Sequence, residues 1–158
     1  MLPNRDSSSL SEEKMISTRG RYAVRILLDL AEHSGGDYIP MKEISARQEI
    51  SLKYTEKIMP LLREGGLVDS IHGLGGGYKL KKDPSDITVY DILKLAEGDL
   101  APVSCLSCGE GGVNTCPRAA ECKTLPMWEE YYRITKEYFA SVTLADLAGQ
   151  TGGGSYVI

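Results

Sequence analysis

The hydrophobic positions of the chain first gather in the segment from Ser17 to His33, where they recur at helical spacing. Residues 34–37, Ser-Gly-Gly-Asp, follow this segment as a stop. The apolar positions cover a wider side than an exposed helix would carry; they are Ala23, Val24, Ile26, Leu27, Leu28, Leu30 and Ala31. The pattern predicts a central core helix, with His33 in its last turn near the negative end of the helix dipole.

Two shorter helices are predicted next. Pro40 suits the start of a helix that carries Ile44, and Ser51 can cap a second helix by accepting a bond from a free backbone N–H group. Gly65 and Gly66 end the second helix, because glycine takes the left-handed C-terminal conformation at little steric cost. The positions expected to face inward are Leu52, Ile58, Met59, Leu61 and Leu62.

A small hairpin is expected after the second helix. Residues 67–71 and 78–82 have strand-like composition, and between them lies the tip His72-Gly73-Leu74-Gly75-Gly76-Gly77. A nucleotide-binding loop is the rival interpretation, but a G-x-G-x-x-G pattern from Gly73 would need glycine where Tyr78 stands. Helix, turn, helix and hairpin together predict a winged helix-turn-helix.

The second half of the chain is predicted to be helical as well. Thr88 and Asp91 indicate a helix start, and Gly98 indicates its end. A long helix is expected from Thr124, its possible cap, to Val142, and a short closing helix then reaches Leu147. The long helix carries a stripe with three-then-four spacing: Trp128, Tyr131, Thr135, Tyr138 and Val142. The stripe packs either within the chain or against a second copy, and we favour the dimer.

These elements divide the chain into five parts. They are a mobile extension (1–13), a winged helix-turn-helix DNA-binding region (14–82), a linking helix with a cysteine-rich loop (83–123), a dimerisation helix with a closing helix (124–148) and a flexible tail (149–158). The expected fold class is α+β, mainly helical. No apolar run of about 18 residues suits a membrane span, and the N-terminus lacks a signal-peptide core, so we expect a cytoplasmic protein without a membrane partner.

The distribution of charge matters more than its total. The whole chain has a net charge of −4, which argues against a nucleic-acid partner. Residues 14–82, however, contain 12 Lys and Arg against 8 Asp and Glu, whereas residues 83–158 contain 5 against 11. Because contact with phosphates requires local positive charge, the basic half remains suited to DNA.

Residues expected to contact DNA lie at three places. The N-terminal part of the second helix would read bases in the major groove with Ser51, Lys53, Tyr54, Glu56 and Lys57. Glu56 is a candidate specificity residue, because a carboxylate is repelled by phosphate but accepts from the cytosine amino group. The hairpin tip would approach the DNA backbone with His72, Gly73, Gly75, Gly76 and Gly77. Arg19 and Arg21 either contact phosphates or are simply solvated.

All the cysteines of the chain fall in one short segment, Cys105, Cys108, Cys116 and Cys122, with the spacing C-x2-C-x7-C-x5-C. Intervening glycines make this loop pliable, and a chain without a secretory signal is not expected to use a disulfide framework. Four thiolates suit tetrahedral zinc or an iron-sulfur cluster, and the spacing does not decide between them. Reactive redox thiols are the remaining alternative. No nucleophile-base pair or carboxylate constellation indicates an enzyme.

Several of these segments resemble the Rrf family of bacterial winged-helix regulators, whose members include IscR, NsrR and CymR. The resemblance extends from Ile16 to Leu147 and rests on residues 17–23, 44–45, 50–51, 54, 62–63, 66–68, 73 and 75–78. It implies a homodimeric transcription factor that binds a near-palindromic operator in double-stranded DNA. We expect this factor to be a repressor. The long C-terminal helix would be the dimer arm.

The resemblance also bears on single residues. Glu56 matches a glutamate that distinguishes two classes of DNA site in one member, and His72 stands where the family often has a minor-groove arginine. For the cysteines it implies a [2Fe-2S] or [4Fe-4S] cluster on Cys108, Cys116 and Cys122, with Cys105 as candidate fourth ligand. The expected function is therefore a regulator that senses iron-sulfur, redox or nitrosative status. A zinc-stabilised DNA-binding or interaction module without a sensing role is the alternative.

Overall fold

The structure is a computed structural model that describes residues 16–107, 114 and 116–149. The predictions for residues 1–13, for Cys108 and for the tail beyond Gly149 lie outside this part. The elements are α1 (Thr18–His33), α2 (Met41–Gln48), α3 (Leu52–Glu64), β1 (Val68–Ile71), β2 (Gly77–Leu80), α4 (Val89–Glu97), α5 (Leu125–Ser141) and α6 (Leu144–Ala148). Short 3-10 turns lie at Pro84–Asp86, Ser104–Leu106 and Ala119–Glu121. The α+β, mainly helical winged helix-turn-helix is confirmed.

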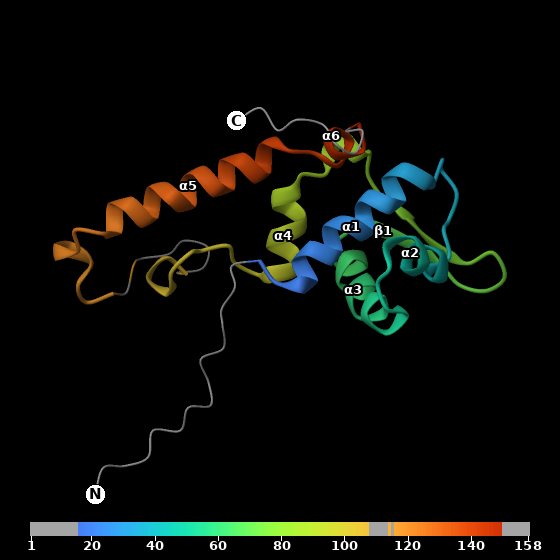
Figure 1. Cartoon of the computed structure of the whole chain (residues 1–158), viewed down its shortest axis with the longest axis horizontal. Coiled ribbons are helices and arrows are strands. Elements are labelled where there is room, and N and C mark those ends of the chain that lie inside the picture. The colour runs from blue at the N-terminus through green and yellow to red at the C-terminus, as the bar shows by residue number, and fades with distance from the viewer. Residues whose placement is uncertain (1–15, 108–113, 115, 150–158) are drawn as a thin grey trace, which may run out of the picture.

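The elements are arranged around α1. Figure 1 shows α1 crossing the middle of the molecule, with α2, α3 and the β1–β2 hairpin at one end and α5 extending away at the other. Helix α4 stands between α1 and α5, and α6 packs on α1. The hairpin and the helix-turn-helix are therefore at a distance from the long helix, and α4 is the element that connects the two regions.

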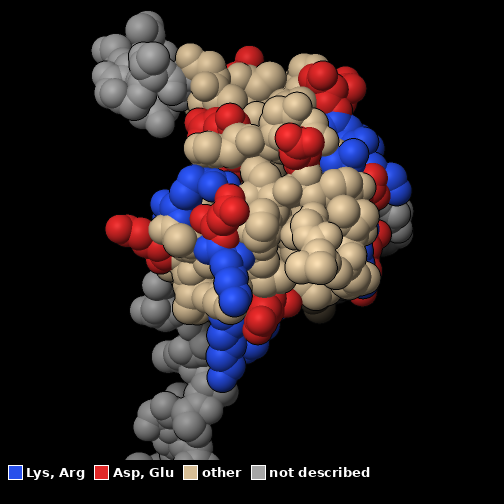
Figure 2. Space-filling model, turned by 90° about the vertical axis from the view of Figure 1, so that its right-hand side faces the viewer, with Lys and Arg blue, Asp and Glu red and all other residues tan. Residues whose placement is uncertain are grey.

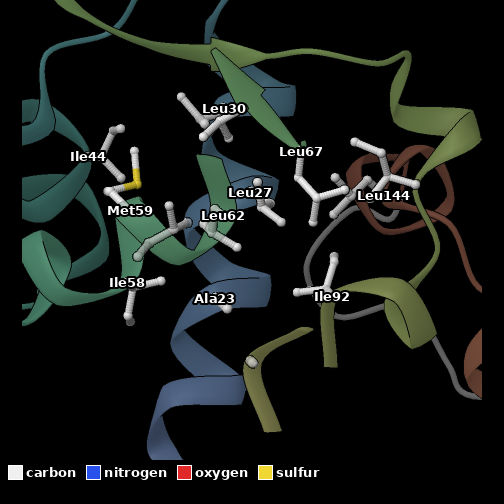
Figure 3. Close-up of a cluster of buried hydrophobic side chains, with 14 of the residues drawn as sticks. Ala23, Leu27, Leu30, Ile44, Ile58, Met59, Leu62, Leu67, Ile92 and Leu144 are labelled. Atoms are coloured by element: carbon white, nitrogen blue, oxygen red, sulfur yellow. The ribbon is translucent and has the colours of Figure 1, made fainter. Parts of the chain in front are cut away.

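The core confirms the prediction that α1 is central. Side chains from α1, α2, α3, α4 and α6 converge on it in Figure 3, where the labelled residues are Ala23, Leu27, Leu30, Ile44, Ile58, Met59, Leu62, Leu67, Ile92 and Leu144. Among the residues expected to face inward from α3, Leu52 is the exception, because 36% of it is exposed. It lies in the first turn of α3, where the helix projects beyond the core.

The helix termini follow the predicted capping residues closely. The Ser51 side chain accepts a bond from the Tyr54 N–H and caps α3, and Gly66, with φ of 73°, takes the left-handed conformation after it. Pro40 occupies the cap position of α2 rather than its first turn. At the other end of α1, His33 Nδ1 lies 2.9 Å from the Asp29 carbonyl oxygen, so the ring is bound to its own helix.

The wing is an antiparallel pair in which Val68 faces Leu80 and Ile71 faces Gly77. Ile39 extends the pairing, because it exchanges two backbone hydrogen bonds with Tyr78, of 2.9 and 2.8 Å. A Cβ at Gly77 would lie 2.3 Å from the Ile39 carbonyl oxygen, so only glycine allows this approach. Ile39, two residues before the start of α2, therefore fixes the hairpin against the helix-turn-helix.

The segments that precede α4 and α6 are hydrogen-bonded to each other. Thr88 with Asp91 and Thr143 with Asp146 form capping boxes, the first of which was predicted. Val89 donates to the Val142 carbonyl at 2.8 Å, so the two starts lie side by side. Thr124 precedes α5 but makes no side-chain cap, which corrects that expectation. The part of the chain that the structure describes contains no helix long and apolar enough to cross a membrane.

Candidate DNA-binding surface and cysteine segment

The first turns of α3 present a small set of polar side chains to solvent. Lys53, Glu56 and Lys57 are exposed, and they stand on a helix whose start is fixed by the Ser51 cap. Thr55 points the other way and is buried, with its hydroxyl 2.9 Å from that of Ser45 in α2. That buried bond sets the rotation of α3 against α2 and so decides which residues face outward.

Tyr54 differs from the other residues expected to read bases. Its ring packs edge-on against Tyr22 of α1, with the ring centroids 5.3 Å apart and the planes at 80°. The Arg25 guanidinium carbon in turn lies 5.4 Å from the centroid of Tyr22. Tyr54 is therefore partly committed to the contact between α3 and α1, which favours a supporting role over a reading role.

A groove of about 370 Å³ separates α3 from the wing. The side chains that line it include Leu52 and Glu56 from α3 and Ile71 and His72 from the hairpin. Leu52 and Ile71 are both partly exposed apolar residues. Because Lys42 and Ser70 also line it, the groove combines one carboxylate and other polar groups with apolar residues, a set suited to a base edge and a thymine methyl group.

The tip of the wing carries a residue that the sequence reasoning passed over. Leu74 is fully exposed, between Gly73 and Gly75, which both have positive φ. A Cβ at Gly76 would lie 2.8 Å from the carbonyl oxygens of Ile71 and Gly73, so the tip is tightly folded. An exposed leucine at the tip of a DNA-binding hairpin is the kind of side chain that can enter a minor groove.

Arg19 and Arg21 lie in the first turn of α1 and are both exposed. Arg21 Nη2 donates to the Thr18 hydroxyl at 3.3 Å, within the same turn. The structure therefore places both guanidinium groups on the surface near the start of the helix. Neither of them is engaged by an acidic residue in the ion pairs of the described chain.

A buried carboxylate in α1 holds the turn of the helix-turn-helix, and the sequence reasoning missed it. Asp29 is fully buried and accepts from Arg47 Nε and Nη2, at 3.0 and 2.7 Å, and from Gln48 Nε2 at 3.0 Å. Burial alone would raise the pKa of Asp29, but the bonds from Arg47 and Gln48 outweigh it and lower the pKa. Arg25 also donates to Gln48. A lone aspartate within an apolar helix was the available signal.

The end of the molecule that carries the wing has both signs of charge. Figure 2 shows Lys and Arg side chains running down the lower part of this face, with Asp and Glu side chains among them. Such a surface gives weaker sequence-independent attraction to phosphates than a uniformly basic one. Positioning of individual side chains must therefore carry much of the interaction with DNA.

The residues between α4 and α5, 98–124, form what we call the cysteine segment. Cys105 lies in a 3-10 turn, and Cys116 and Cys122 stand on either side of another, Ala119–Glu121. All three are half-buried, and Cys108 lies outside the described residues. Among the residues described, no three His, Cys, Asp or Glu side chains are grouped as metal ligands.

Two polar contacts in the cysteine segment involve cysteines, one through a thiol and one through a backbone N–H group. Cys122 Sγ lies 3.3 Å from the Thr124 hydroxyl, and bonds from Thr124, with the nearby Arg118 charge, lower the pKa of this thiol. The Cys116 N–H donates to the Asn114 side-chain oxygen at 2.9 Å. Among the residues that the structure describes, the Asn114 Nδ2 atom is a buried donor without a hydrogen-bond partner, and a donor of this kind suits a sulfur acceptor.

Helix α5 has two apolar faces. Tyr132, Phe139 and, just beyond the helix, Val142 pack against α4 and its surroundings. A second face is open to solvent, and its residues are between 44% and 57% exposed: Met127, Tyr131, Ile134 and Tyr138. The predicted stripe therefore falls across both faces, with Trp128 and Thr135 half-buried between them. Met127 and Ile134 were missed because the sequence pattern was followed from Trp128.

The fold, with an exposed recognition helix beside a hairpin wing, defines a winged-helix DNA-binding protein. The family model of Rrf2, described as an iron-dependent transcriptional regulator, matches residues 16–150. The chain therefore belongs to the Rrf2 family and is a DNA-binding transcriptional regulator. This confirms the resemblance seen in the sequence.

Similar proteins agree with this assignment. The chain is 39% identical to protein rrf2 of Nitratidesulfovibrio vulgaris over 132 residues, which are 84% of this chain and 85% of that protein. It is 36% identical over 132 residues to the transcriptional regulator IscR of Escherichia coli, covering 84% and 78% of the two chains. The structure of CymR, the global cysteine regulator of B. subtilis, matches with a TM-score of 0.70 and 34% identity over 86% of this chain and 97% of that one. The structure of T. potens IscR matches with a TM-score of 0.64 and 31% identity over 90% and 96%.

Proposed function

We propose that the chain is a homodimeric transcriptional repressor that senses iron-sulfur, redox or nitrosative status through its cysteine segment. The observation that carries the sensing part is the position of the four cysteines. All of them lie in the single segment that joins α4, which packs on the DNA-binding half, to α5. A change in that segment can therefore reach the DNA-binding half through α4.

For DNA binding, we assign specificity to Glu56 and the groove beside it, and affinity to exposed cations. Glu56 lines the groove with Leu52 and Ile71, where a carboxylate can accept from a cytosine amino group. Lys53 and Lys57 flank it on α3, and Arg19 and Arg21 extend the positive charge along α1. His72 and the glycines 73, 75 and 76 bring the wing close to the sugar-phosphate backbone, whereas Gly77 is buried against Ile39 and holds the wing in place.

For the dimer, we assign the open face of α5 defined by Met127, Tyr131, Ile134 and Tyr138. These side chains follow a four-three-four spacing and lie on one side of a helix that contains no buried residue. Two copies of such a face can bury one another, which removes apolar area from water. The two recognition helices of the dimer would then meet two half-sites of a near-palindromic operator.

The dimer is tested by sedimentation of the full chain with Tyr131→Glu and Tyr138→Glu combined. The expected result is a monomer, because each charge would have to enter an apolar contact. The matched control is Glu129→Lys, an exposed charge change on another side of the same helix. A dimer that survives the double substitution would assign association to another surface.

For the cysteine segment, we propose that Cys108, Cys116 and Cys122 hold an iron-sulfur cluster and that Cys105 is the fourth ligand. Thiolates are the soft ligands that such clusters require. The Thr124 hydroxyl beside Cys122 and the buried amide of Asn114 next to Cys116 support this donor set. When bound, the cluster supplies reactivity toward oxygen or nitric oxide. The cysteines of this chain would hold it within the segment that joins α4 to α5.

The cofactor is tested by anaerobic purification, with iron, sulfide and zinc content and visible absorbance as readouts. Cys→Ser at positions 108, 116 or 122 should abolish the absorbance, and Cys105→Ser should have a smaller effect if an outside ligand replaces it. Ser104→Ala, at the exposed neighbour of Cys105, is the matched control. Colourless protein with stoichiometric zinc would support the second candidate, a zinc-stabilised module without a sensing role, because four thiolates also suit zinc.

A further inference from the structure

The end of α4 is bonded to the start of α1. The Glu97 carboxylate oxygen Oε1 accepts from the Ser17 N–H at 2.9 Å and from the Ser17 hydroxyl at 2.8 Å. The Ser17 side-chain oxygen in turn accepts from the Gly20 N–H at 3.4 Å and caps α1. The residue that caps α1 is therefore itself held by a carboxylate 80 positions later in the chain.

The contact is close enough to define where the first turn of α1 lies. A Cβ at Gly20 would be 2.2 Å from Glu97 Oε1 and 3.2 Å from Leu93 Cδ2, so any larger residue would displace the carboxylate. Gly20 lies between Arg19 and Arg21, the two exposed cations of this turn. Glu97 thus fixes the backbone that carries both guanidinium groups.

On its other side, the chain that leaves α4 and begins the cysteine segment is bonded to α5. The residue after Glu97 is Gly98, with φ of 80°, and Asp99 follows it. Asp99 Oδ1 accepts from the Tyr132 hydroxyl of α5 at 2.8 Å and from the Ala101 N–H at 3.0 Å. The cysteine segment is therefore bonded to α5 through a carboxylate only two residues from Glu97, and the local bond from Ala101 fixes that carboxylate.

We propose that residues 97–99 are a joint through which α5 and the cysteine segment set the position of the DNA-contacting turn of α1, with Glu97 as the positioning residue. The joint rests on the proposed function and extends it to the route of regulation. Movement of α5 or of the cysteine segment displaces Asp99, and the backbone of Gly98 transmits this displacement to Glu97. Because Ser17 caps α1 and its backbone N–H and hydroxyl are both bonded to Glu97, Arg19 and Arg21 then shift relative to the phosphates.

The first test uses full-length variants and a labelled duplex that the wild-type chain has selected from a random library. Glu97→Ala should weaken binding roughly three- to tenfold and reduce the dependence of log K on log salt by about 1–2, because each phosphate contact contributes about 0.9. Glu97→Gln should restore most of the affinity, since the amide oxygen can accept both Ser17 bonds. Glu32→Ala removes the same charge from the exposed far end of α1 and should leave affinity close to wild type.

A double-mutant comparison shows whether Glu97 acts through the arginines. Adding Glu97→Ala to Arg19→Ala and Arg21→Ala should cause no further loss of affinity, because the groups it positions are already gone. A full additional loss would overturn the joint, and so would equal affinities for Glu97→Ala and Glu97→Gln. Circular dichroism of each variant verifies that the fold is kept.

The second test does not involve DNA. Tyr132→Phe removes only the hydroxyl bonded to Asp99, and it should raise hydrogen exchange at the Gly20 and Arg21 amides, whose acceptors belong to Ser17. Tyr38→Phe, which removes a hydroxyl beyond the opposite end of α1, is the control and should not change that exchange. Unchanged exchange in Tyr132→Phe overturns the joint even if the wild-type chain binds DNA. If Tyr132→Phe raises hydrogen exchange at these amides but the wild-type chain binds no duplex, the proposed function is overturned and the proposed joint is supported.

Discussion

Replacing Asp29 by alanine tests whether one buried carboxylate holds the helix-turn-helix against α1. The side chain is fully buried and accepts two bonds from Arg47 and one from Gln48, at 2.7–3.0 Å. Its partners come from the last turn of α2, just before Glu49, which has a positive φ of 53°. Loss of the carboxylate should therefore loosen the turn that orients α3.

The magnitude follows from the exposure of the partner. Removing one member of a fully buried ion pair costs about 3–5 kcal/mol, because the remaining charge is left without compensation. The Arg47 side chain is 31% exposed and can regain water, which reduces the expected loss for Asp29→Ala to about 2–3 kcal/mol. For a chain of this length the melting temperature should fall by about 4–12 °C.

Urea unfolding followed by circular dichroism, at one protein concentration, measures the change. Asp37→Ala removes an exposed carboxylate just after the same helix and is the matched control. It should alter the free energy of unfolding by less than about 0.5 kcal/mol. If Asp29→Ala is no less stable than this control, the bonds to Arg47 and Gln48 do not hold the turn, and the reasoning is refuted.

Three further outcomes are expected. The stability difference between wild type and Asp29→Ala should persist above the ordinary aspartate pKa of 3.8 and be lost as pH falls below that value. The reason is that a lowered folded-state pKa means that only the ionised carboxylate stabilises the fold. The free energy of unfolding, measured as a function of pH, tests this prediction. Lys57→Ala should weaken binding equally across DNA sequences, whereas Glu56→Ala should relax discrimination at one base pair by about 1–3 kcal/mol in a binding-site selection. Gly77→Ala should cost about 1–3 kcal/mol in thermal unfolding, because its Cβ would lie 2.3 Å from the Ile39 carbonyl oxygen.

The sequence was sufficient for the local elements. Ser51 and Thr88 cap helices as predicted, and the apolar positions of α1 form the core. These successes have one physical cause, since capping and amphipathic spacing act within a few residues of the chain. The departures are at element edges. Leu52 is exposed because it begins α3 beyond the core, and Thr124 lies next to Cys122 instead of capping α5.

The bonds between distant parts of the chain were not predictable in this way. In the sequence Asp29 stands out only as an aspartate among apolar residues and Glu97 looks like an ordinary helix charge, and only the fold brings them to Arg47 and Ser17. For a similar reason, the predicted stripe on α5 combined residues from two different faces of the helix. Helical spacing shows that Tyr131 and Tyr132 are both large and partly apolar, but it does not show which side meets α4. The cysteine spacing likewise identifies a candidate ligand set without deciding between iron-sulfur and zinc.

Gly20 and Gly77 in the family-like segments, and Gly65 next to one of them, lie where two elements pack closely. A Cβ at Gly20, Gly65 or Gly77 would lie 2.2 Å from Glu97 Oε1, 2.3 Å from Leu95 Cδ2 and 2.3 Å from the Ile39 carbonyl oxygen respectively. Each glycine thus marks a point where two elements nearly touch: α1 with α4, the end of α3 with α4, and the wing with the start of α2. Because α4 takes part in two of these contacts, its last turn constrains both the arginine-bearing turn of α1 and the end of the recognition helix. Residues that look like a DNA-binding signature therefore have a second role. They allow the DNA-binding elements to pack closely against α4, the helix that leads into the cysteine segment.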